Sequence, residues 1–144
     1  QKYVCDHLGV NKRMDELQAA VLDVKLKYLD EDNDRRRAIA RVYYENLRGV
    51  VLPARLPDAE NVYHLFPVFH PDRDRLQRDL LSAGIETLIH YPIPPHRQRC
   101  YVEYASLSLP VTERLAATEL SLPISPVMSI DKAFAVCEAV NRNA

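Results

Sequence analysis

The spacing of apolar residues changes partway along this chain, and that change restricts the possible folds more than any other feature. In the first third, apolar residues recur every three or four positions, as on one face of a helix. This stripe consists of Met14, Leu17, Val21, Val24 and Tyr28, and it restarts at Ile39, Tyr43 and Leu47. An acidic run at residues 30–34 interrupts the stripe, and Gly49 follows its end. The pattern predicts a long helical arm, or two helices end to end, over residues 13–48.

The rest of the chain alternates between strand and helix patterns. Residues 61–69 are rich in β-branched and aromatic side chains and predict a strand, in which Pro67 favours an edge position or a strand end. Residues 85–89 predict a second short strand. Helices are expected at residues 72–83, 111–119 and 130–140, the first of them ended by Gly84. Two or three short strands with helices packed on them predict an α+β fold, a single domain over residues 1–144.

Composition excludes several classes of function. The 144 residues include 19 lysines and arginines against 20 acidic residues, a net charge of −1, so no overall positive field attracts nucleic acid or anionic lipid. The apolar runs are too short to span a membrane. Three cysteines without CxxC spacing predict neither a disulfide framework nor a zinc site, and a cytoplasmic protein is expected. The chain begins with Gln-Lys-Tyr, so we expect it to be part of a longer protein.

Two polar segments are candidate sites. The first, Gly9-Val10-Asn11-Lys12-Arg13, precedes the long helix, where donors such as Asn11 and Arg13 could hold a phosphate. The alternative is that Asn11 belongs to the helix cap and Arg13 is solvated. The second follows the strand at residues 85–89 and contains His90, Tyr91 and His96 among several prolines. Histidines in a rigid loop can donate hydrogen bonds or carry protons, or they can be structural. Their spacing does not match a helical zinc pair, so no metal site is predicted.

Two further features have simpler readings. Tyr63 and His64 are neighbours in a predicted strand and so face opposite sides, and a core position for Tyr63 is the simpler interpretation. The basic cluster, Arg35 to Arg37 with Arg41, follows an acidic run, which indicates ion pairs on a solvated helix face rather than nucleic-acid binding. Glycine-rich phosphate loops, serine-hydrolase elbows and zinc-protease motifs are absent from the sequence.

An ordered series of motifs extends along nearly the whole chain. It comprises Gly9-x-Asn11-x-Arg13-Met14-Asp15-Glu16-Leu17-Gln18-Ala19-Ala20, Arg36-Arg37-x-Ile39-Ala40-x-x-Tyr43, Val62-Tyr63-His64-Leu65-Phe66, Gly84-Ile85-x-Thr87-x-Ile89-His90-Tyr91-Pro92, His96-x-Gln98 and Leu120-Ser121-Leu122-Pro123-Ile124. In this order the motifs resemble the sugar aminotransferases of the DegT/DnrJ/EryC1/StrS family.

The resemblance implies the small C-terminal domain of a fold-type I aminotransferase, with long N-terminal helices and a short, mainly antiparallel sheet covered by helices. Such enzymes use pyridoxal 5′-phosphate to move an amino group, usually from glutamate, onto a nucleotide-linked keto sugar. The products serve cell-surface polysaccharides such as lipopolysaccharide, or natural products. The family's large domain, which carries the lysine that binds the cofactor covalently, is absent here. None of the five lysines, Lys2, Lys12, Lys25, Lys27 and Lys132, matches that position, so this chain alone is expected to be inactive.

The family pattern also implies roles for individual residues. Asn11 and Arg13 would contact the cofactor phosphate of a neighbouring subunit in a homodimer. His90, Tyr91 and His96 would approach the sugar nucleotide, and the form of this loop is most similar to members acting on dTDP-linked 3-keto-6-deoxyhexoses. Three alternatives stay open at this point: a non-catalytic dimerisation module, a DNA-binding regulator that uses the basic cluster, and a related dehydratase with histidine at the lysine position.

Overall fold

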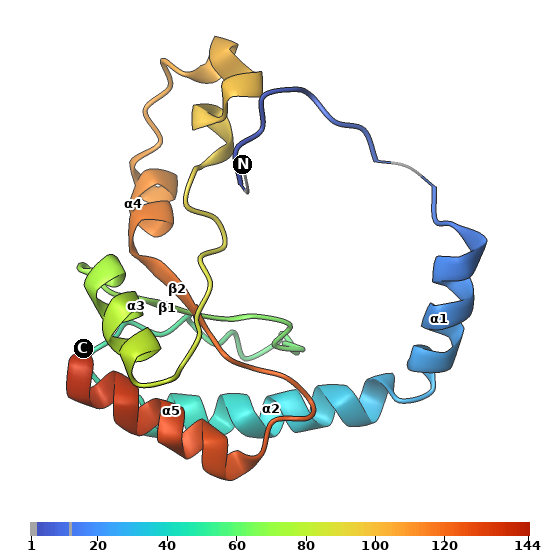
Figure 1. Cartoon of the computed structure of the whole chain (residues 1–144), viewed down its shortest axis with the longest axis vertical. Helices are drawn as coiled ribbons and strands as arrows, with labels where there is room; N and C mark the ends of the chain where they lie inside the picture. Colours follow the sequence, from blue (N-terminus) through green and yellow to red (C-terminus); the bar gives the residue numbers. More distant parts are fainter. Residues whose placement is uncertain (1–2, 12) are drawn as a thin grey trace.

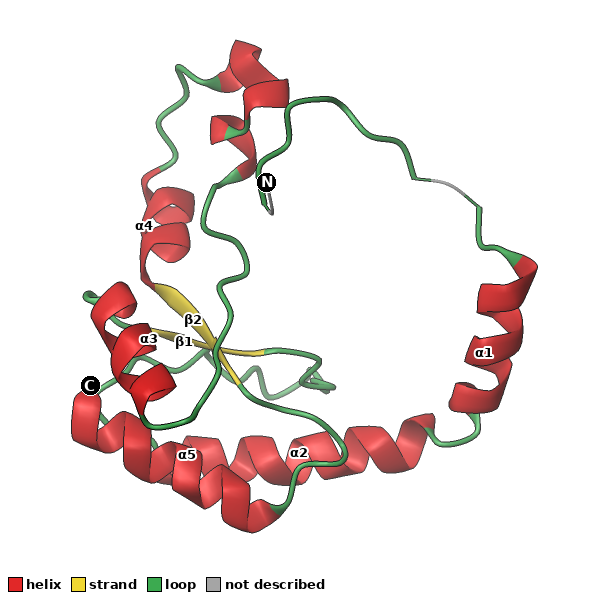
Figure 2. Ribbon diagram, in the orientation of Figure 1, coloured by secondary structure: helices red, strands yellow, loops and turns green. Residues whose placement is uncertain are grey.

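A computed structural model describes residues 3–11 and 13–144 of the chain. Along the chain (Figures 1 and 2), the elements are α1 (Glu16–Leu26), α2 (Leu29–Asn46), β1 (Phe66–Phe69), α3 (Arg73–Ser82), the 3₁₀ helices η1 (Pro95–Arg97) and η2 (Arg99–Tyr104), α4 (Pro110–Thr118), β2 (Glu119–Leu122) and α5 (Ile130–Asn143). The predicted α+β fold is therefore confirmed, with helices and a small antiparallel sheet. Within the described residues, no helix is both long and apolar enough to cross a membrane.

The core lies where α2 and α5 run side by side beneath the sheet (Figure 1). Tyr43 of α2 is fully buried, packs edge-on against Phe66 of β1 with ring centroids 4.9 Å apart, and donates its hydroxyl to the Pro123 carbonyl. The pair thus joins α2, β1 and the end of β2 in one cluster. The largest fully buried side chains are Tyr43, Phe66, Ile39, Leu76, Leu80, Leu120, Val68 and Val140.

The sheet is shorter than the sequence predicts. β1 pairs antiparallel with β2, Phe66 opposite Leu122, and single bridged pairs flank it: Val51 with Phe69 on one side and Leu88 with Ser121 on the other. Residues 61–65 do not join the strand, since Tyr63 has a positive φ of 48° that is incompatible with extended backbone. In the part of the chain that the structure describes, residues 85–89 form a bridge only at Leu88. The predicted second strand is thus reduced to one bridge.

Pro67 fits this sheet without loss of a ladder bond. The Phe69 N–H donates outward to Val51 O (2.9 Å), and N–H groups two residues apart point to the same side of a strand. The N–H that Pro67 lacks would therefore point to the outer edge rather than to β2. The predicted edge position of Pro67 is confirmed.

The first helical region is divided at Lys27–Tyr28, ahead of the acidic run that was predicted to break it. Asp30, Glu31 and Asp32 instead form the first turn of α2, where negative charge favours the positive end of the helix dipole. Asp15 is the N-cap residue of α1 and forms a capping box with Gln18. No residue of α1 is buried, and the helix lies apart from the core (Figure 1).

Candidate functional site

His90 is held by a buried polar pair on β2. Its backbone N–H donates to Glu119 Oε2 (2.7 Å), and its Nδ1 lies 3.0 Å from Ser121 Oγ. The Ser121 hydroxyl donates in turn to Glu119 Oε1 at 2.5 Å. Glu119 and Ser121 are each only 5% exposed. The loop that begins at His90 is therefore anchored by residues 29 and 31 positions away in sequence.

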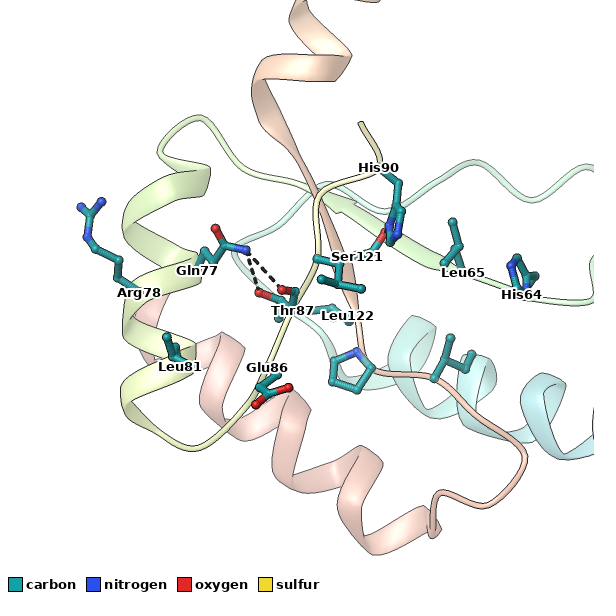
Figure 3. Close-up of a pocket in the computed structure, with 13 residues that line it drawn as sticks. His64, Leu65, Gln77, Arg78, Leu81, Glu86, Thr87, His90, Ser121 and Leu122 are labelled. Carbon is teal, nitrogen blue, oxygen red and sulfur yellow. Dashed lines mark hydrogen bonds between the residues drawn. The ribbon is translucent and has the colours of Figure 1, made fainter. Parts of the chain in front are cut away.

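A hollow of about 520 Å³ lies beside this anchor, between α3, residues 86–90 and the end of β2 (Figure 3). His90 and Ser121 point toward one another at one end of it, and His64 lies beyond Leu65. At the other end, Gln77 Nε2 donates to Thr87 O (3.3 Å) and so fixes residues 86–88 against α3. We call this the smaller hollow.

A second cavity, of about 880 Å³, lies between the N-terminal segment, the loop after His90 and α4. We call residues 3–11 and 13–15 the strap, and this space the strap cavity. Both His90 and Tyr91 line it, and Tyr91 is 59% exposed with its ring edge-on to Tyr3. Other wall residues are Leu8, Phe69, Ile93, Tyr101, Leu115 and Glu119. A cavity of this size, mostly apolar with a few polar groups, is typical of a small-molecule site.

Gln98 ties the strap to the loop. Its side-chain Oε1 accepts from the Cys5 N–H, and its Nε2 donates to the Tyr3 carbonyl, both at 3.0 Å. The Cys100 N–H donates to Cys5 O (2.9 Å) and extends the pairing. The Gln98 side chain and the Cys100 N–H therefore hold the two walls of the strap cavity together.

His96 does not join His90 and Tyr91 at the cavity walls. It is 5% exposed, and its Nε2 lies 3.0 Å from Glu113 Oε1, an oxygen that also accepts from Arg97 (3.1 Å). Neither hollow includes His96 in its lining. Its buried Nδ1 has no hydrogen-bond partner in the part of the chain that the structure describes. The structure thus uses His96 to fix the loop to α4, a position that the family pattern alone does not reveal.

The Glu113 carboxyl has a lowered pKa. The backbone N–H of Leu109 contributes most to the lowering, and the hydrogen bonds from His96 and Arg97 add to it. A carboxyl whose folded-state pKa lies below its unfolded value stabilises the protein above the unfolded pKa. That contribution is lost as the pH falls through the lower, folded-state pKa.

We expect Glu113→Gln to lower the urea midpoint of unfolding at pH 7, because the charged acceptor of three donors is lost. The difference from the parent protein should shrink as the pH falls through the lowered folded-state pKa of Glu113, below which the native carboxyl is also neutral. Urea melts at several pH values, followed by circular dichroism, measure this. Glu45→Gln, on the exposed face of α2, is the matched control and should have little effect. A deficit that stays constant down to pH 3 would contradict the assignment.

Asn11 and Arg13 lie exposed on the strap, ahead of the helix that begins at Glu16. Asp15, not Asn11, caps that helix, so the cap alternative for Asn11 is wrong. Neither residue lines the two hollows, and neither has a hydrogen-bond partner within the described residues. An amide and a guanidinium presented outward suit a phosphate on another molecule. Lys25, Lys27 and Lys132 lie outside both hollows, and Lys2 and Lys12 are not among the described residues.

The two remaining candidate features have structural roles. Tyr63 is half-buried against Tyr44 and Phe66, in agreement with the core position predicted for it. In the basic cluster, Arg35 pairs with Glu31 (3.0 Å) and Arg37 with Asp34 (2.7 Å), which confirms the predicted ion pairs along the helix. The described part of the chain holds no group of three potential metal ligands.

Sequence reasoning missed Glu119, Ser121 and the clamp formed by Gln98. One signal was available: Glu119 and Ser121 alternate with leucines in a short apolar strand, so both polar side chains share one face. Their partner His90 is distant in sequence, and no local pattern connects the two. The structure adds these residues to the site.

Comparisons with known proteins identify the family of the chain. A family model described as the DegT/DnrJ/EryC1/StrS aminotransferase family matches residues 1–141. The chain is 49% identical over 144 residues to dTDP-3-amino-3,6-dideoxy-alpha-D-galactopyranose transaminase of Aneurinibacillus thermoaerophilus, covering 99% of this chain and 40% of that protein.

Two solved structures are similar over nearly the same length. DesV of S. venezuelae, in complex with a ketimine intermediate, has a TM-score of 0.85 at 43% identity and covers 99% of this chain and 40% of that one. NtdA of Bacillus subtilis, with bound cofactor PMP, has a TM-score of 0.79 at 32% identity and covers 93% of this chain and 33% of that one. The chain thus spans about 40% of the length of the relatives it matches.

Proposed function

Because the chain belongs to the DegT/DnrJ/EryC1/StrS aminotransferase family, we propose that the whole protein is a pyridoxal-phosphate-dependent aminotransferase acting on a nucleotide-linked sugar. It transfers an amino group from glutamate to the keto group of a dTDP-linked 3-keto-6-deoxyhexose. The match of the family over residues 1–141 carries the proposal. The relative from Aneurinibacillus, named for a dTDP-3-amino-3,6-dideoxy sugar, supports the choice of substrate. NtdA, with its bound PMP, supports the choice of cofactor.

In this proposal the chain forms one wall of the substrate-binding site. His90 and Tyr91 contact the sugar nucleotide in the strap cavity, and His96 and Gln98 position the loop that carries them. The apolar surface around them excludes water from the bound sugar. When bound, the cofactor supplies the ring that accepts electrons from the reacting carbon. The lysine that binds it covalently is assigned to the rest of the protein, so this chain alone is expected to be inactive.

The test of the proposed activity uses the full-length enzyme with its cofactor, glutamate and dTDP-3-keto-6-deoxyglucose. We expect one dTDP-linked amino sugar and one 2-oxoglutarate for each turnover, identified by mass spectrometry and a coupled assay. The matching 4-keto sugar nucleotide is the control and should react far more slowly. Loss of water from the sugar without incorporation of nitrogen would instead indicate a dehydratase.

The exposed apolar side chains of α1 support a homodimer. Leu17 of α1 is 75% exposed and Val21 and Val24 are each 55% exposed, and Met14, just before the helix, is 61% exposed. Neighbouring exposed apolar side chains of this kind favour burial against another surface. In the proposed dimer, the strap that leads into α1 reaches the neighbouring subunit, where Asn11 and Arg13 donate to the cofactor phosphate. A DNA-binding role has less support, because Arg35 and Arg37 already have acidic partners.

Asn11→Ala in the full-length enzyme should weaken cofactor retention roughly tenfold or more, the usual effect of losing a hydrogen bond to a charged group. The measurement is the cofactor absorbance that remains after dialysis, titrated back with added cofactor. Asn33→Ala on α2 is the matched control and should retain the cofactor normally. Unchanged occupancy in the Asn11 variant would remove this role.

A further inference from the structure

Glu119 is a buried carboxylate without a cationic partner in the described part of the chain. It is 5% exposed, and no arginine, lysine or histidine side chain forms an ion pair with it there. The nearest guanidinium contact, from Arg73, goes to its backbone carbonyl (2.8 Å) instead of its side chain. A buried carboxylate is costly unless hydrogen bonds replace its hydration. Here the donors are the His90 N–H and the Ser121 hydroxyl.

With Glu119 ionised, the donors and acceptors in this group fix the proton on His90. An ionised carboxylate only accepts hydrogen bonds, so the single hydroxyl proton of Ser121 points to Glu119. Ser121 Oγ must therefore accept from His90 Nδ1, 3.0 Å away, and Nδ1 must carry a hydrogen. In a neutral imidazole the other nitrogen, Nε2, is then a hydrogen-bond acceptor.

This Nε2 is free to bind a ligand. His90 is half-buried, lines both the smaller hollow and the strap cavity, and its Nε2 has no partner within the described residues. Figure 3 shows the ring directed toward Ser121 at the end of the smaller hollow. An acceptor at this position suits an O–H donor, such as a sugar hydroxyl. It does not suit a keto oxygen or a diphosphate, which have no proton to donate.

We propose that Glu119 and Ser121 are positioning residues that hold His90 in its Nδ1-protonated form, so that Nε2 accepts a hydrogen bond from a hydroxyl of the sugar substrate. This inference rests on the proposed function for its ligand, but the proton position on His90 does not depend on it. A protonated Glu119 would reverse the chain of hydrogen bonds and place the proton on Nε2. The two arrangements are therefore distinguishable in the protein without substrate.

The experiment uses full-length holoenzyme labelled with ¹⁵N-histidine at about pH 8, above the ordinary pKa of histidine. Nitrogen chemical shifts report which ring nitrogen carries the proton, and His90→Gln identifies the signal. We expect the Nδ1-protonated form in the parent enzyme and loss of that preference in Ser121→Ala. Ser121→Thr, which keeps the hydroxyl, should restore it. Ser82→Ala, a distant serine on α3, is the matched control and should leave the signal unchanged.

Kinetics separate positioning from a merely structural role. In Ser121→Ala, the KM for the sugar nucleotide should rise about tenfold, the effect of one weakened hydrogen bond, while kcat and the KM for glutamate change little. A proton on Nε2 in the parent enzyme would overturn the inference, even if Ser121→Ala failed to fold. An unchanged His90 signal and KM in a folded Ser121→Ala would do the same. Failure to aminate the sugar, with His90 protonated on Nδ1, would contradict the proposed function alone.

Discussion

Replacing Phe66 by alanine is expected to lower the free energy of unfolding by about 3–5 kcal/mol, the usual cost of removing a buried aromatic ring. Phe66 is fully buried, and its ring contacts Tyr43, Tyr44 and Tyr63 at centroid distances of 4.9, 5.3 and 6.1 Å. The cavity left behind would separate β1 from α2, because these rings form the contact between the two elements. Urea unfolding of the chain, followed by circular dichroism, measures the loss.

Phe134→Ala is the matched control for this experiment. Phe134 lies on α5 and is 43% exposed, so its removal should cost well under half as much. Equal losses in the two variants would show that the aromatic cluster around Phe66 does not hold the domain together.

Gln98→Leu is expected to release the strap. The substitution removes the acceptor of the Cys5 N–H and the donor to the Tyr3 carbonyl, two hydrogen bonds worth about 1 kcal/mol each. The equilibrium between docked and released strap should therefore move by roughly 30-fold. Hydrogen exchange at the Cys5 and Cys100 amides, both bonded across this contact, should accelerate accordingly.

Gln77→Leu tests whether any half-buried glutamine has this effect. Gln77 bonds Thr87 on the far side of the smaller hollow and does not contact the strap. Exchange at Cys5 and Cys100 should be unchanged in this variant. If Gln98→Leu also leaves exchange unchanged, the strap is held by its other contacts, such as Arg99 with Asp6.

Local sequence patterns predicted the helices, whose limits depend on residues close together in the sequence. The helix α3, its end at Gly84 with a φ of +78°, and the helices α4 and α5 all follow from residues within one turn of one another. The two predicted strands were too long and β2 was not predicted as a strand, because strand length and pairing depend on partners. Within the described residues, 61–65 have no partner strand and 85–89 find one only at Leu88.

The residues of the candidate site were also predicted only where local patterns suffice. The sequence identified His90 and Tyr91, which lie at a cavity wall, but their roles toward a substrate stay predictions. Glu119, Ser121 and Gln98 contribute through contacts that span 29 to 95 residues, and no periodicity reports such contacts. His96 belongs to the same motif as Gln98, yet its burial against Glu113 depends on how α4 packs.

Pro67 has a consequence beyond the fold of this chain. A two-stranded sheet exposes its outer strand to strands of other molecules, which can add to it and begin aggregation. On the outer side of β1, Val51 pairs with Phe69, and Pro67, two residues earlier on the same side, offers no N–H. A foreign strand in register would lose a hydrogen bond at that position. The same residue that fits the native sheet therefore discourages its growth, which matters most while the chain is newly made and its neighbours are not yet in place.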